Sequence, residues 1–340
     1  MFAKITAAME KQVYAITADD VEQARDRIKV LKTPLLSFLD FNERTGRTLF
    51  FKCELMQRSG SFKFRGASNA IALLDVTKTA FGVTTHSSGN HAAALALAAK
   101  IQGIPAIIVM PSNAPLIKRN AVESYGAKVI SCEPTQAARE AAAKNVVDET
   151  GAEFIHPSED PRVIAGQGTM ALELIEQVKE IDGGVLDAVI VPVGGGGMIS
   201  GIAIALKACN PLIRIIGAEP LAANDAFRSK QTGEWQGHLN GVTPKTIADG
   251  LKTTLGPNTY PIVRDFVDEI ICVSESQIAS ALRTVYETMK LAIEPSAAVG
   301  VAALLSEELS LVSRPHLKRI GIILCGGNID LSELPALLGE

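Results

Sequence analysis

Ser59-Gly60-Ser61-Phe62-Lys63-Phe64-Arg65-Gly66-Ala67 is the most informative stretch of this sequence. It places a lysine at the start of a helical pattern, and a lysine amine forms a Schiff base with a carbonyl compound when its pocket favours the neutral form. A second stretch, Ser87-Ser88-Gly89-Asn90-His91, is a loop of small polar residues and glycine. A third, Gly194 to Gly197, is an unbroken run of glycines. Together they predict a site where a reactive amine can meet a carbonyl cofactor.

The length, net charge and composition of the chain limit which kinds of partner it can have. Its 340 residues carry 33 basic and 37 acidic side chains, a formal net charge of −4, without a basic block. Because aromatic residues amount to only 5% as well, we expect neither nucleic acid nor a membrane as the main partner. An apolar fraction of 47% supports well-filled cores, and the length suits two domains.

The cysteines and the N-terminus indicate the compartment. The five cysteines are scattered, and none belongs to a CxxC pair. No apolar run follows a basic start, and the longest runs, such as Ala92 to Ala99, are far shorter than a membrane span. We therefore expect a reduced, cytoplasmic protein without structural zinc.

Short β-branched runs alternate with alanine-rich helical patterns along most of the chain, which is typical of parallel βα units. Strands are expected at residues 48–54, 82–86, 106–110, 128–132, 188–193, 213–219, 270–273 and 319–324. Helices are expected at residues 21–31, 62–74, 91–102, 116–125, 136–149, 164–179, 199–208, 276–290 and 297–306. This order predicts an α/β fold.

The block from residue 82 to residue 156 stands out because it contains three expected strands and three expected helices in strict alternation. We predict that 82–156 forms a small domain, inserted into a large domain made of 1–81 and 157–340. Ligands in open α/β folds bind beside the carboxyl ends of strands, so the cleft between the two domains is the expected site.

Gly194-Gly195-Gly196-Gly197-Met198 directly follows the strand expected at 188–193 and opens the next helix. Four glycines leave backbone N–H groups unshielded and the helix N-terminus adds positive potential, which together favour a phosphate group. The spacing is not G-x-G-x-x-G and no Gly-Lys-Ser/Thr follows, which argues against a dinucleotide fold and against a P-loop. The plainer alternative is a tight turn between strand and helix.

Ser87-Ser88-Gly89-Asn90-His91 also lies between an expected strand and an expected helix. Its hydroxyls, its amide and the helix N-terminus would suit a carboxylate, such as that of an amino acid. The alternative is a plain helix start that Asn90 caps.

Two further strand ends carry side chains with possible chemistry. Glu219 and Asp225 offer the oxygen ligands that Mg²⁺ or Ca²⁺ prefers, although acidic residues at a strand end are more often solvated. Cys325 follows the strand expected at 319–324 and has three interpretations: a packed thiol, a nucleophile, or a weak hydrogen-bond partner of a ring nitrogen.

These residues resemble the fold-type-II (tryptophan synthase β-like) pyridoxal-phosphate enzymes, specifically the serine racemase and serine/threonine dehydratase family. The resemblance runs from Thr33-Pro34 to Asn328-Ile329-Asp330-Leu331. It rests on four motifs: Ser-Phe-Lys-x-Arg-Gly-Ala, Ser-Ser-Gly-Asn-His, Ala165-Gly166-Gln167-Gly168-Thr169 and the four glycines. It implies two open, twisted, mostly parallel sheets flanked by helices, pyridoxal phosphate as the cofactor, and a homodimer.

The resemblance implies which residues hold the cofactor: Phe62, Lys63, Asn90, Gly194 through Met198, Glu294 and Cys325. Within this set Lys63 would be the Schiff-base lysine, Phe62 would lie against the cofactor ring, and Asn90 would contact the ring hydroxyl. The four glycines with Met198 would hold the phosphate. Cys325 would face the ring nitrogen and leave it unprotonated, which points to expulsion of a β-leaving group.

The implied substrates are β-hydroxy amino acids, most of all L-serine and also L-threonine. Freed Lys63 would remove the α-proton, and loss of the β-hydroxyl would give a 2-oxo acid and ammonia. In the racemases the serine that Ser88 resembles lies on the opposite face, whereas dehydratases usually have alanine there. Two bases on opposite faces are what inversion requires, so D-serine is a second expected product.

The substrate itself would be bound, by the same resemblance, by Ser87, Ser88, Asn90, His91 and Arg139. Arg139 matches a racemase arginine that reaches the distal polar group of the substrate, and its alternative is a solvated helix charge. A guanidinium can receive a hydroxyl or a second carboxylate, so 3-hydroxyaspartate is an alternative substrate.

The resemblance also matches Glu219, the carbonyl of Ala223, and Asp225 to a site for a divalent cation, Mg²⁺ or else Ca²⁺ or Mn²⁺. The chain departs from the pattern at Ser158, where animal racemases commonly have asparagine. It also has Thr253-Thr254 in place of a serine pair. Both departures alter the expected lining of the pocket.

Two other functions are weighed against this one. A β-replacement synthase of the same fold typically shows Thr-Ser-Gly-Asn-Thr at the carboxylate loop, whereas this chain has His91 after Asn90. A nucleotide-binding or regulatory protein would use the glycine run for a nucleotide phosphate, but it would leave Lys63 without a role.

Overall fold

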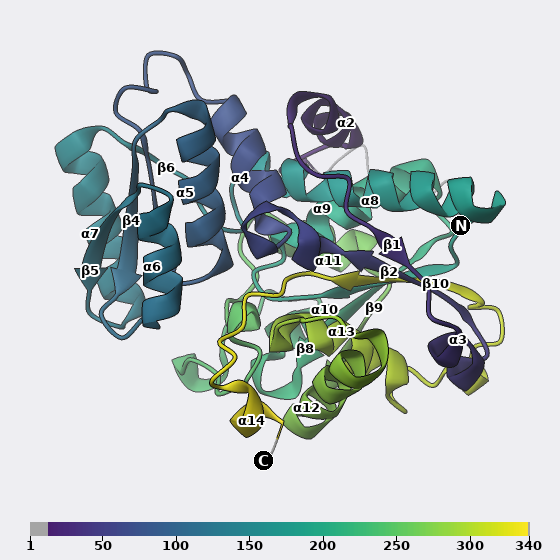
Figure 1. Cartoon of the computed structure of the whole chain (residues 1–340). Coiled ribbons are helices and arrows are strands. Elements are labelled where there is room, and N and C mark those ends of the chain that lie inside the picture. The colour runs from purple at the N-terminus through teal and green to yellow at the C-terminus, as the bar shows by residue number, and fades with distance from the viewer. Residues whose placement is uncertain (1–12, 339–340) are drawn as a thin grey trace.

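Two β-sheets organise the computed structural model, which describes residues 13–338 (Figure 1). The larger sheet has the strand order β1 (Leu35–Leu36), β2 (Thr48–Cys53), β10 (Arg319–Leu324), β7 (Ala188–Pro192), β8 (Arg214–Pro220) and β9 (Glu269–Val273). Only the pairing of β1 with β2 is antiparallel. The smaller sheet is parallel throughout and has the order β5 (Lys128–Cys132), β4 (Ala106–Pro111), β3 (Val83–His86) and β6 (Glu153–Phe154). The predicted fold class is confirmed.

Helices cover both faces of each sheet (Figure 1). Against the larger sheet lie α8 (Pro161–Asp182) and α9 (Gly197–Cys209) with α2 (Ala18–Arg27) packed on them, and on the other face α13 (Pro295–Leu305) with α12 (Glu275–Thr284). The smaller sheet lies between α7 (Gln136–Thr150) on one side and, on the other, α5 (Asn90–Gln102) and α6 (Leu116–Ser124). Shorter helices are α3 (Leu39–Thr45), α10 (Asp225–Thr232), α11 (Thr259–Phe266) and α14 (Leu334–Leu337).

Local sequence explains the central elements. Strand β7 reads Ala-Val-Ile-Val-Pro and is buried at every position, as a parallel strand covered on both faces requires. Helix α8 begins after Asp160, whose side chain accepts a hydrogen bond from Arg162 N, and Pro161 occupies its first turn. It ends at Gly183, whose φ of 70° is the left-handed conformation that glycine adopts without strain.

Helix α4 (Lys63–Ala72) connects the two parts of the molecule, because it packs on α5 along one side and on α8 along the other (Figure 1). Phe64, Ala67 and Ile71 belong to the hydrophobic core beneath the smaller sheet. Arg65 instead makes hydrogen bonds to α8. Lys63, at the start of α4, therefore lies where the two sheets with their helices meet.

Several elements differ from the sequence-based expectations. The block 82–156 contains four strands rather than three, because the two-residue strand β6 is too short to show a pattern; β1 escaped prediction for the same reason. The helix expected at 276–290 is α12 followed by a π-helical turn, Val285–Met289, that ends at Lys290 with a φ of 58°. Helices α3, α10, α11 and α14 were not expected either. The domain boundaries at 82 and 156 stay a prediction.

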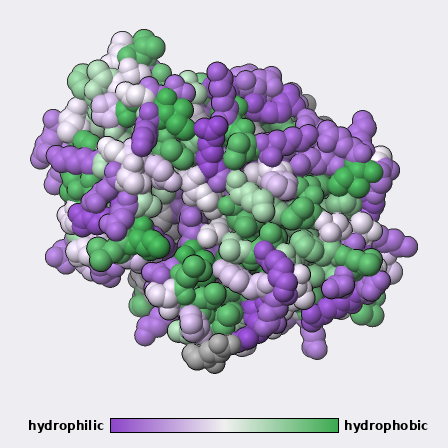
Figure 2. Space-filling view, in the orientation of Figure 1, coloured by the Kyte–Doolittle hydropathy of each residue, from purple (hydrophilic) through white to green (hydrophobic). Residues whose placement is uncertain are grey.

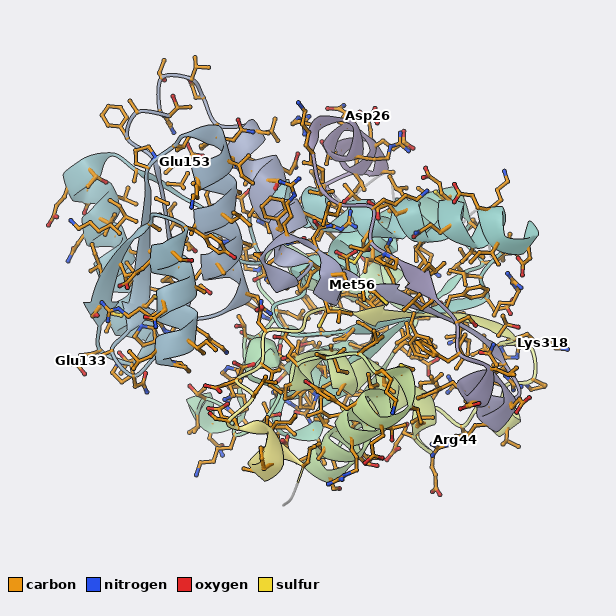
Figure 3. All side chains as sticks on the ribbon, viewed as in Figure 1. Asp26, Arg44, Met56, Glu133, Glu153 and Lys318 are labelled. Atoms are coloured by element: carbon orange, nitrogen blue, oxygen red, sulfur yellow. The ribbon has the colours of Figure 1, made fainter. Side chains whose placement is uncertain are left out.

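The surface agrees with the mixed charge of the sequence. Figure 2 shows hydrophilic and hydrophobic groups interspersed over the face turned to the viewer. Charged side chains such as Asp26, Arg44, Glu133 and Lys318 are exposed at the periphery (Figure 3). Across residues 13–338, no helix combines the length and the apolar character that crossing a membrane would need.

Candidate active site

Lys63 is the first residue of α4, and its surroundings make it an unusual lysine. Its Nζ donates a hydrogen bond to the carbonyl oxygen of Pro157 at 2.8 Å and lies 5.1 Å from the centroid of the Phe62 ring. The backbone before it is joined to the end of β10, since Phe62 N donates to the Cys325 carbonyl at 3.0 Å. Burial of the amine lowers the pKa of Lys63 to about 8, so a far larger share of it is neutral near physiological pH than of an ordinary lysine.

A cavity of about 320 Å³ opens in front of the Lys63 amine. It lies beyond the carboxyl ends of β3, β7 and β10, the usual ligand position in open α/β sheets. The predicted site residues that line it are Phe62, Lys63, Ser87, Ser88, Asn90, His91, Arg139, Gly194 to Gly197, Met198, Glu294 and Cys325. Residues 120 or more positions apart in the chain thus share one cavity, as the sequence analysis expected.

The glycine run forms the turn from β7 into α9, which begins at Gly197. Gly196 has a φ of 79°, and a Cβ at Gly197 would lie 2.8 Å from the carbonyl oxygen of Ser158. Side chains are therefore excluded from this turn, which lines the cavity at the start of a 13-residue helix whose first N–H groups have no partner within the helix. Such a turn is suited to an anion.

Asn90 is positioned by hydrogen bonds rather than used as a helix cap. Helix α5 begins after Gly89 and has no side-chain cap. Instead, Asn90 Nδ2 donates to Glu294 Oε1 at 2.7 Å, and Asn90 Oδ1 accepts from Asn328 Nδ2 at 2.8 Å. Burial, with the charge of Asp249 as a second cause, raises the pKa of Glu294 to about 8. The capping alternative for Asn90 is therefore wrong.

Ser87 and Ser88 line the cavity from the loop between β3 and α5, and His91 lines it from the first turn of α5. The His91 ring is 2% exposed, and its Nε2 lies 3.3 Å from the Ile155 carbonyl oxygen. Burial lowers the pKa of His91 well below the usual range, so the ring is neutral. Ser88 lies in the middle of the three-residue loop, 87–89, that joins the end of β3 to the start of α5.

Cys325 follows β10 and is 2% exposed. Burial raises the pKa of its thiol well above the usual range, so the group is a neutral thiol at physiological pH. A neutral thiol is a poor nucleophile and a weak hydrogen-bond partner. These properties disfavour the nucleophile interpretation of Cys325.

Arg139 lies on α7 and reaches the cavity from the part of the molecule that contains the smaller sheet. Its Nε is buried and has no hydrogen-bond partner among the described residues. A guanidinium that lines a cavity without a partner for one of its donors is placed to receive a ligand oxygen. The position disfavours the solvated-charge interpretation of Arg139.

The carboxylates of Glu219 and Asp225 lie in the protein interior, with exposures of 0% and 1%. Glu219 accepts hydrogen bonds from Phe227 N at 2.8 Å and Ala226 N at 3.2 Å, and Asp225 Oδ2 accepts from Leu255 N at 2.9 Å. Burial and the charge of Asp225 raise the pKa of Glu219 well above its usual range, and burial raises the pKa of Asp225 to about 6. Within residues 13–338 no cluster of three or more acidic, histidine or cysteine side chains is arranged for a metal.

Sequence reasoning missed several residues of the cavity. Pro157 contributes a backbone carbonyl, which carries no sequence signal. Lys118, on α6, and Asp249, far from it in the chain, form an ion pair on the lining of the cavity. Asn328 could have been found, because it ends the quoted Cys325-Gly326-Gly327-Asn328 turn. Ser158 and Thr253, two of the departures from the family pattern, also line the cavity.

Comparison with known protein families agrees with this geometry. Residues 27–326 match the model of the family described as pyridoxal-phosphate dependent enzyme. The chain belongs to this family. It is 50% identical over 327 residues to the serine racemase of Arabidopsis thaliana (95% of this chain, 96% of the relative) and 49% identical over 325 residues to that of Homo sapiens (94% and 93%). The structure of maize serine racemase superimposes with a TM-score of 0.90 at 48% identity, covering 94% of this chain and 96% of the maize chain.

Proposed function

We propose that this pyridoxal-phosphate dependent enzyme acts on L-serine, converting it to D-serine and, by elimination of water, to pyruvate and ammonia. The observation that carries the proposal is that Lys63 and Ser88 line one cavity together with the glycine loop. The serine racemases to which the chain is similar across almost its whole length support the same substrate. L-Threonine, which differs by one methyl group, is a second proposed substrate.

The residues of the cavity fit the cofactor. The side-chain-free turn at Gly194 to Gly197 matches a phosphate group in size and charge preference, and the buried Ser158 Oγ beside it has no partner among the described residues. Lys63 has the amine and the lowered pKa that linkage to an aldehyde needs. Phe62, Asn90 and Cys325 would hold the ring. When bound, pyridoxal phosphate takes up the electron pair left on the α-carbon after proton removal.

Lys63 and Ser88 divide the proton transfers in this proposal. The Lys63 amine would accept the α-proton at Nζ. The Pro157 carbonyl orients that amine, because Nζ donates to it at 2.8 Å. Ser88 Oγ returns a proton to the other face of the α-carbon, which inverts it. Departure of the β-hydroxyl, which takes up a proton and leaves as water, instead gives 2-aminoacrylate, and a water molecule then hydrolyses this to the 2-oxo acid and ammonia.

A second candidate substrate, 3-hydroxyaspartate, is favoured by Arg139. The guanidinium lines the cavity, and its Nε lacks a partner among the described residues. A second carboxylate on the substrate would satisfy that donor by a charge-assisted hydrogen bond. Arg139→Lys keeps the positive charge but removes the planar guanidinium. If Arg139 binds the second carboxylate, this variant should lose activity toward 3-hydroxyaspartate, whereas a mere surface charge would be replaced without loss.

The deciding experiment is a chiral product assay on the purified enzyme with L-serine, L-threonine and the isomers of 3-hydroxyaspartate. We expect D-serine and pyruvate from L-serine, and loss of both in Lys63→Ala. A 2-oxo acid without any D-isomer would reduce the function to that of a dehydratase. Activity that survives in Lys63→Ala would overturn the mechanism.

Glu219, Ala223 and Asp225 are proposed to bind a divalent cation, with Mg²⁺ as the first choice. Burial raises the pKa of both carboxylates and the charge of Asp225 raises that of Glu219 further, so a bound cation would offset an unfavourable pair of negative charges. Oxygen donors are the ligands that Mg²⁺ and Ca²⁺ prefer.

We also propose that the protein is a homodimer and that it lies in the cytoplasm. Sedimentation analysis tests the oligomeric state.

A further inference from the structure

The motif Ala165-Gly166-Gln167-Gly168-Thr169 has no part in the proposed function, although it is among the most distinctive stretches of the chain. It lies within α8, and all five residues are buried. Helix α8 packs against α4, which carries Lys63, and against α9, which begins at the glycine loop (Figure 1). The motif therefore lies between the two elements that would hold the ends of the cofactor.

On the α4 side the two helices touch backbone to backbone. A Cβ at Gly166 would lie 2.7 Å from the Arg65 carbonyl oxygen and 2.7 Å from Gly66 Cα. The side chain of Gln167 follows at once, and its Oε1 accepts a hydrogen bond from Gly66 N at 3.1 Å. No substitution with a larger side chain fits here without separating α4 from α8.

The hydrogen bond of Gln167 compensates for a defect at the start of α4. The first N–H groups of a helix have no partner within it, and a polar side chain at the preceding residue usually accepts from one of them. In α4 that preceding residue is Phe62, which makes no such bond; Phe64 N and Arg65 N donate to the Ser61 and Phe62 carbonyls, and Gly66 N is the next group that needs an acceptor. Gln167, 1% exposed, supplies the acceptor from the neighbouring helix instead.

Thr169 adds a second polar contact one helical half-turn away. Its Oγ1 accepts from Arg65 Nη1 at 3.2 Å and donates to the Gly166 carbonyl at 2.7 Å. The remaining donors of Arg65 bind Glu54 and Glu173 at 2.8 Å. Residues 65 and 66, immediately after Lys63, are thus fixed to α8 through side chains.

The other side of the motif faces α9. A Cβ at Gly168 would lie 2.7 Å from the Gly201 carbonyl oxygen, so these backbones also touch. Gly201 lies one turn after Gly197, where the glycine turn ends and α9 begins. Four consecutive residues of α8, 166–169, therefore contact either α4, which carries Lys63, or α9, which begins at the glycine turn.

We propose that Gln167 is a positioning residue for the Lys63 amine. By accepting from Gly66 N it fixes the start of α4 on α8, and α8 in turn fixes α4 relative to the glycine turn. The carbonyl that accepts from the Lys63 amine belongs to Pro157, only a few residues before α8. A shift of α4 against α8 would therefore lengthen the 2.8 Å hydrogen bond between Lys63 and Pro157. The inference rests on the proposed roles of Lys63 and of the glycine turn.

The test compares three variants of the purified holoenzyme. Gln167→Met keeps the approximate volume but removes the acceptor, whereas Gln167→Glu retains an acceptor at the same position. Met170→Ala is the control, because Met170 is fully buried in the same helix but belongs to the core of the larger sheet. For each we measure the melting temperature and the steady-state kinetics of pyruvate formation from L-serine.

We expect kcat of Gln167→Met to fall about 10-fold or more with KM nearly unchanged, because a displacement of ~1 Å at reacting groups costs on the order of 100-fold in rate. Gln167→Glu should recover most of kcat. Met170→Ala should lower the melting temperature about as much as Gln167→Met does, but its kcat should stay at the parent value. Equal kcat in Gln167→Met and Met170→Ala would overturn the proposal and leave Gln167 a packing residue.

Thr169→Val provides a second arm if Gln167→Met does not fold. It removes the acceptor of Arg65 while keeping the shape of the side chain, and we expect the same loss in kcat, to a smaller extent. Unchanged kcat in Thr169→Val would then contradict the proposal. Failure of the proposed function itself would be visible separately, as absence of turnover in the parent enzyme or turnover in Lys63→Ala.

Discussion

At the scale of single residues, the chemistry of Lys63 is a property of its surroundings. The sequence places the lysine at a helix start, where such a side chain is usually solvated. In the structure its amine is buried and bonded to the Pro157 carbonyl, and burial lowers its pKa to about 8. Glu294, Cys325 and His91 nearby are all shifted toward their neutral forms by burial. The Lys63 amine is thus surrounded by neutral, desolvated groups.

The lowered pKa of Lys63 predicts how the rate at which its amine is acylated depends on pH. In the cofactor-free protein the neutral amine forms as the pH rises through about 8, whereas an ordinary lysine amine forms only near 10.4. The rate of acylation of Lys63 should therefore level off above about pH 9, measured by mass spectrometry of the peptide that contains it. A rate that still rises steeply between pH 9 and pH 10.5 would contradict this assignment.

Ser88 predicts a separation of the two reactions. In Ser88→Ala the second proton donor is absent but the Lys63 amine is unchanged, so D-serine formation should fall by about 100-fold or more, the usual contribution of a general acid or base. Pyruvate formation should persist. Chiral chromatography of the products measures both rates in one sample. An equal loss of both products would show that Ser88 only binds the substrate carboxylate.

At the scale of secondary structure, the glycine turn and helix α9 act as one element. The turn is packed against the backbone of Ser158, so its shape depends on the absence of side chains. We expect Gly197→Ala to cost ~1–3 kcal/mol through the forced contact with Ser158 and to weaken cofactor binding about 10-fold. The dissociation constant of pyridoxal phosphate, followed by absorbance, checks this.

Gly237→Ala is the matched control for that prediction, because a Cβ at Gly237 would meet nothing within 4 Å. It should leave both the melting temperature and cofactor affinity at the parent values. If Gly197→Ala behaved like Gly237→Ala, the turn would have room for a side chain and could not be the close-fitting phosphate site proposed here.

Helix α4 is tied to strand β2 and helix α8 by a buried ionic network. Arg65, fully buried, bonds to Glu54 and Glu173, and the equally buried Lys52 bonds to Glu173 at 2.8 Å. Arg65→Met would leave the buried Glu54 without its ion-pair partner and Glu173 with Lys52 alone, and we expect the free energy of unfolding to fall by ~3–5 kcal/mol. Arg25→Met, at a half-exposed ion pair on α2, should change it by less than about 1 kcal/mol. Denaturant unfolding of the two variants makes the comparison.

At the scale of the whole molecule, the cavity exists because two parallel sheets with their helices share helix α4. Residues of the smaller part, Ser87 to His91 and Arg139, face residues of the larger part, the glycine turn and Cys325. A substrate between them would contact both. The ion pair of Lys118 with Asp249 also joins the two parts at the rim of this cavity.

The buried carboxylates of Glu219 and Asp225 predict that a divalent cation stabilises the molecule. Added Mg²⁺ should raise the free energy of unfolding by ~2.7 kcal/mol at about 100 times its dissociation constant, and a chelator should lower it. Asp225→Asn can still accept from Leu255 N but loses the charge, so it should not respond to Mg²⁺. Thermal unfolding that is the same with Mg²⁺, with Ca²⁺ and with chelator would rule out the cation site.

The sequence predicted every strand of four or more residues in both sheets. The strands expected at 128–132 and 319–324 coincide with β5 and β10, because each is rich in β-branched residues and lies between turn residues, which leaves no room for a competing helical pattern. It failed for β1 and β6, two residues each, whose pairing comes from neighbouring strands rather than from their own residues. The candidate site was predicted at the residues with motifs and missed at Pro157, Lys118 and Asp249.

By itself, the sequence determined the fold class, the family motifs and the residue types of the site, because these depend on local periodicity and on short, contiguous patterns. Only the tertiary structure decided which groups meet. Lys63 bonds to Pro157, Gly66 to Gln167 and Asn90 to Asn328, pairs 94, 101 and 238 positions apart in the chain. Such contacts, and the pKa shifts that burial causes, depend on how helices and strands pack, which no local pattern encodes.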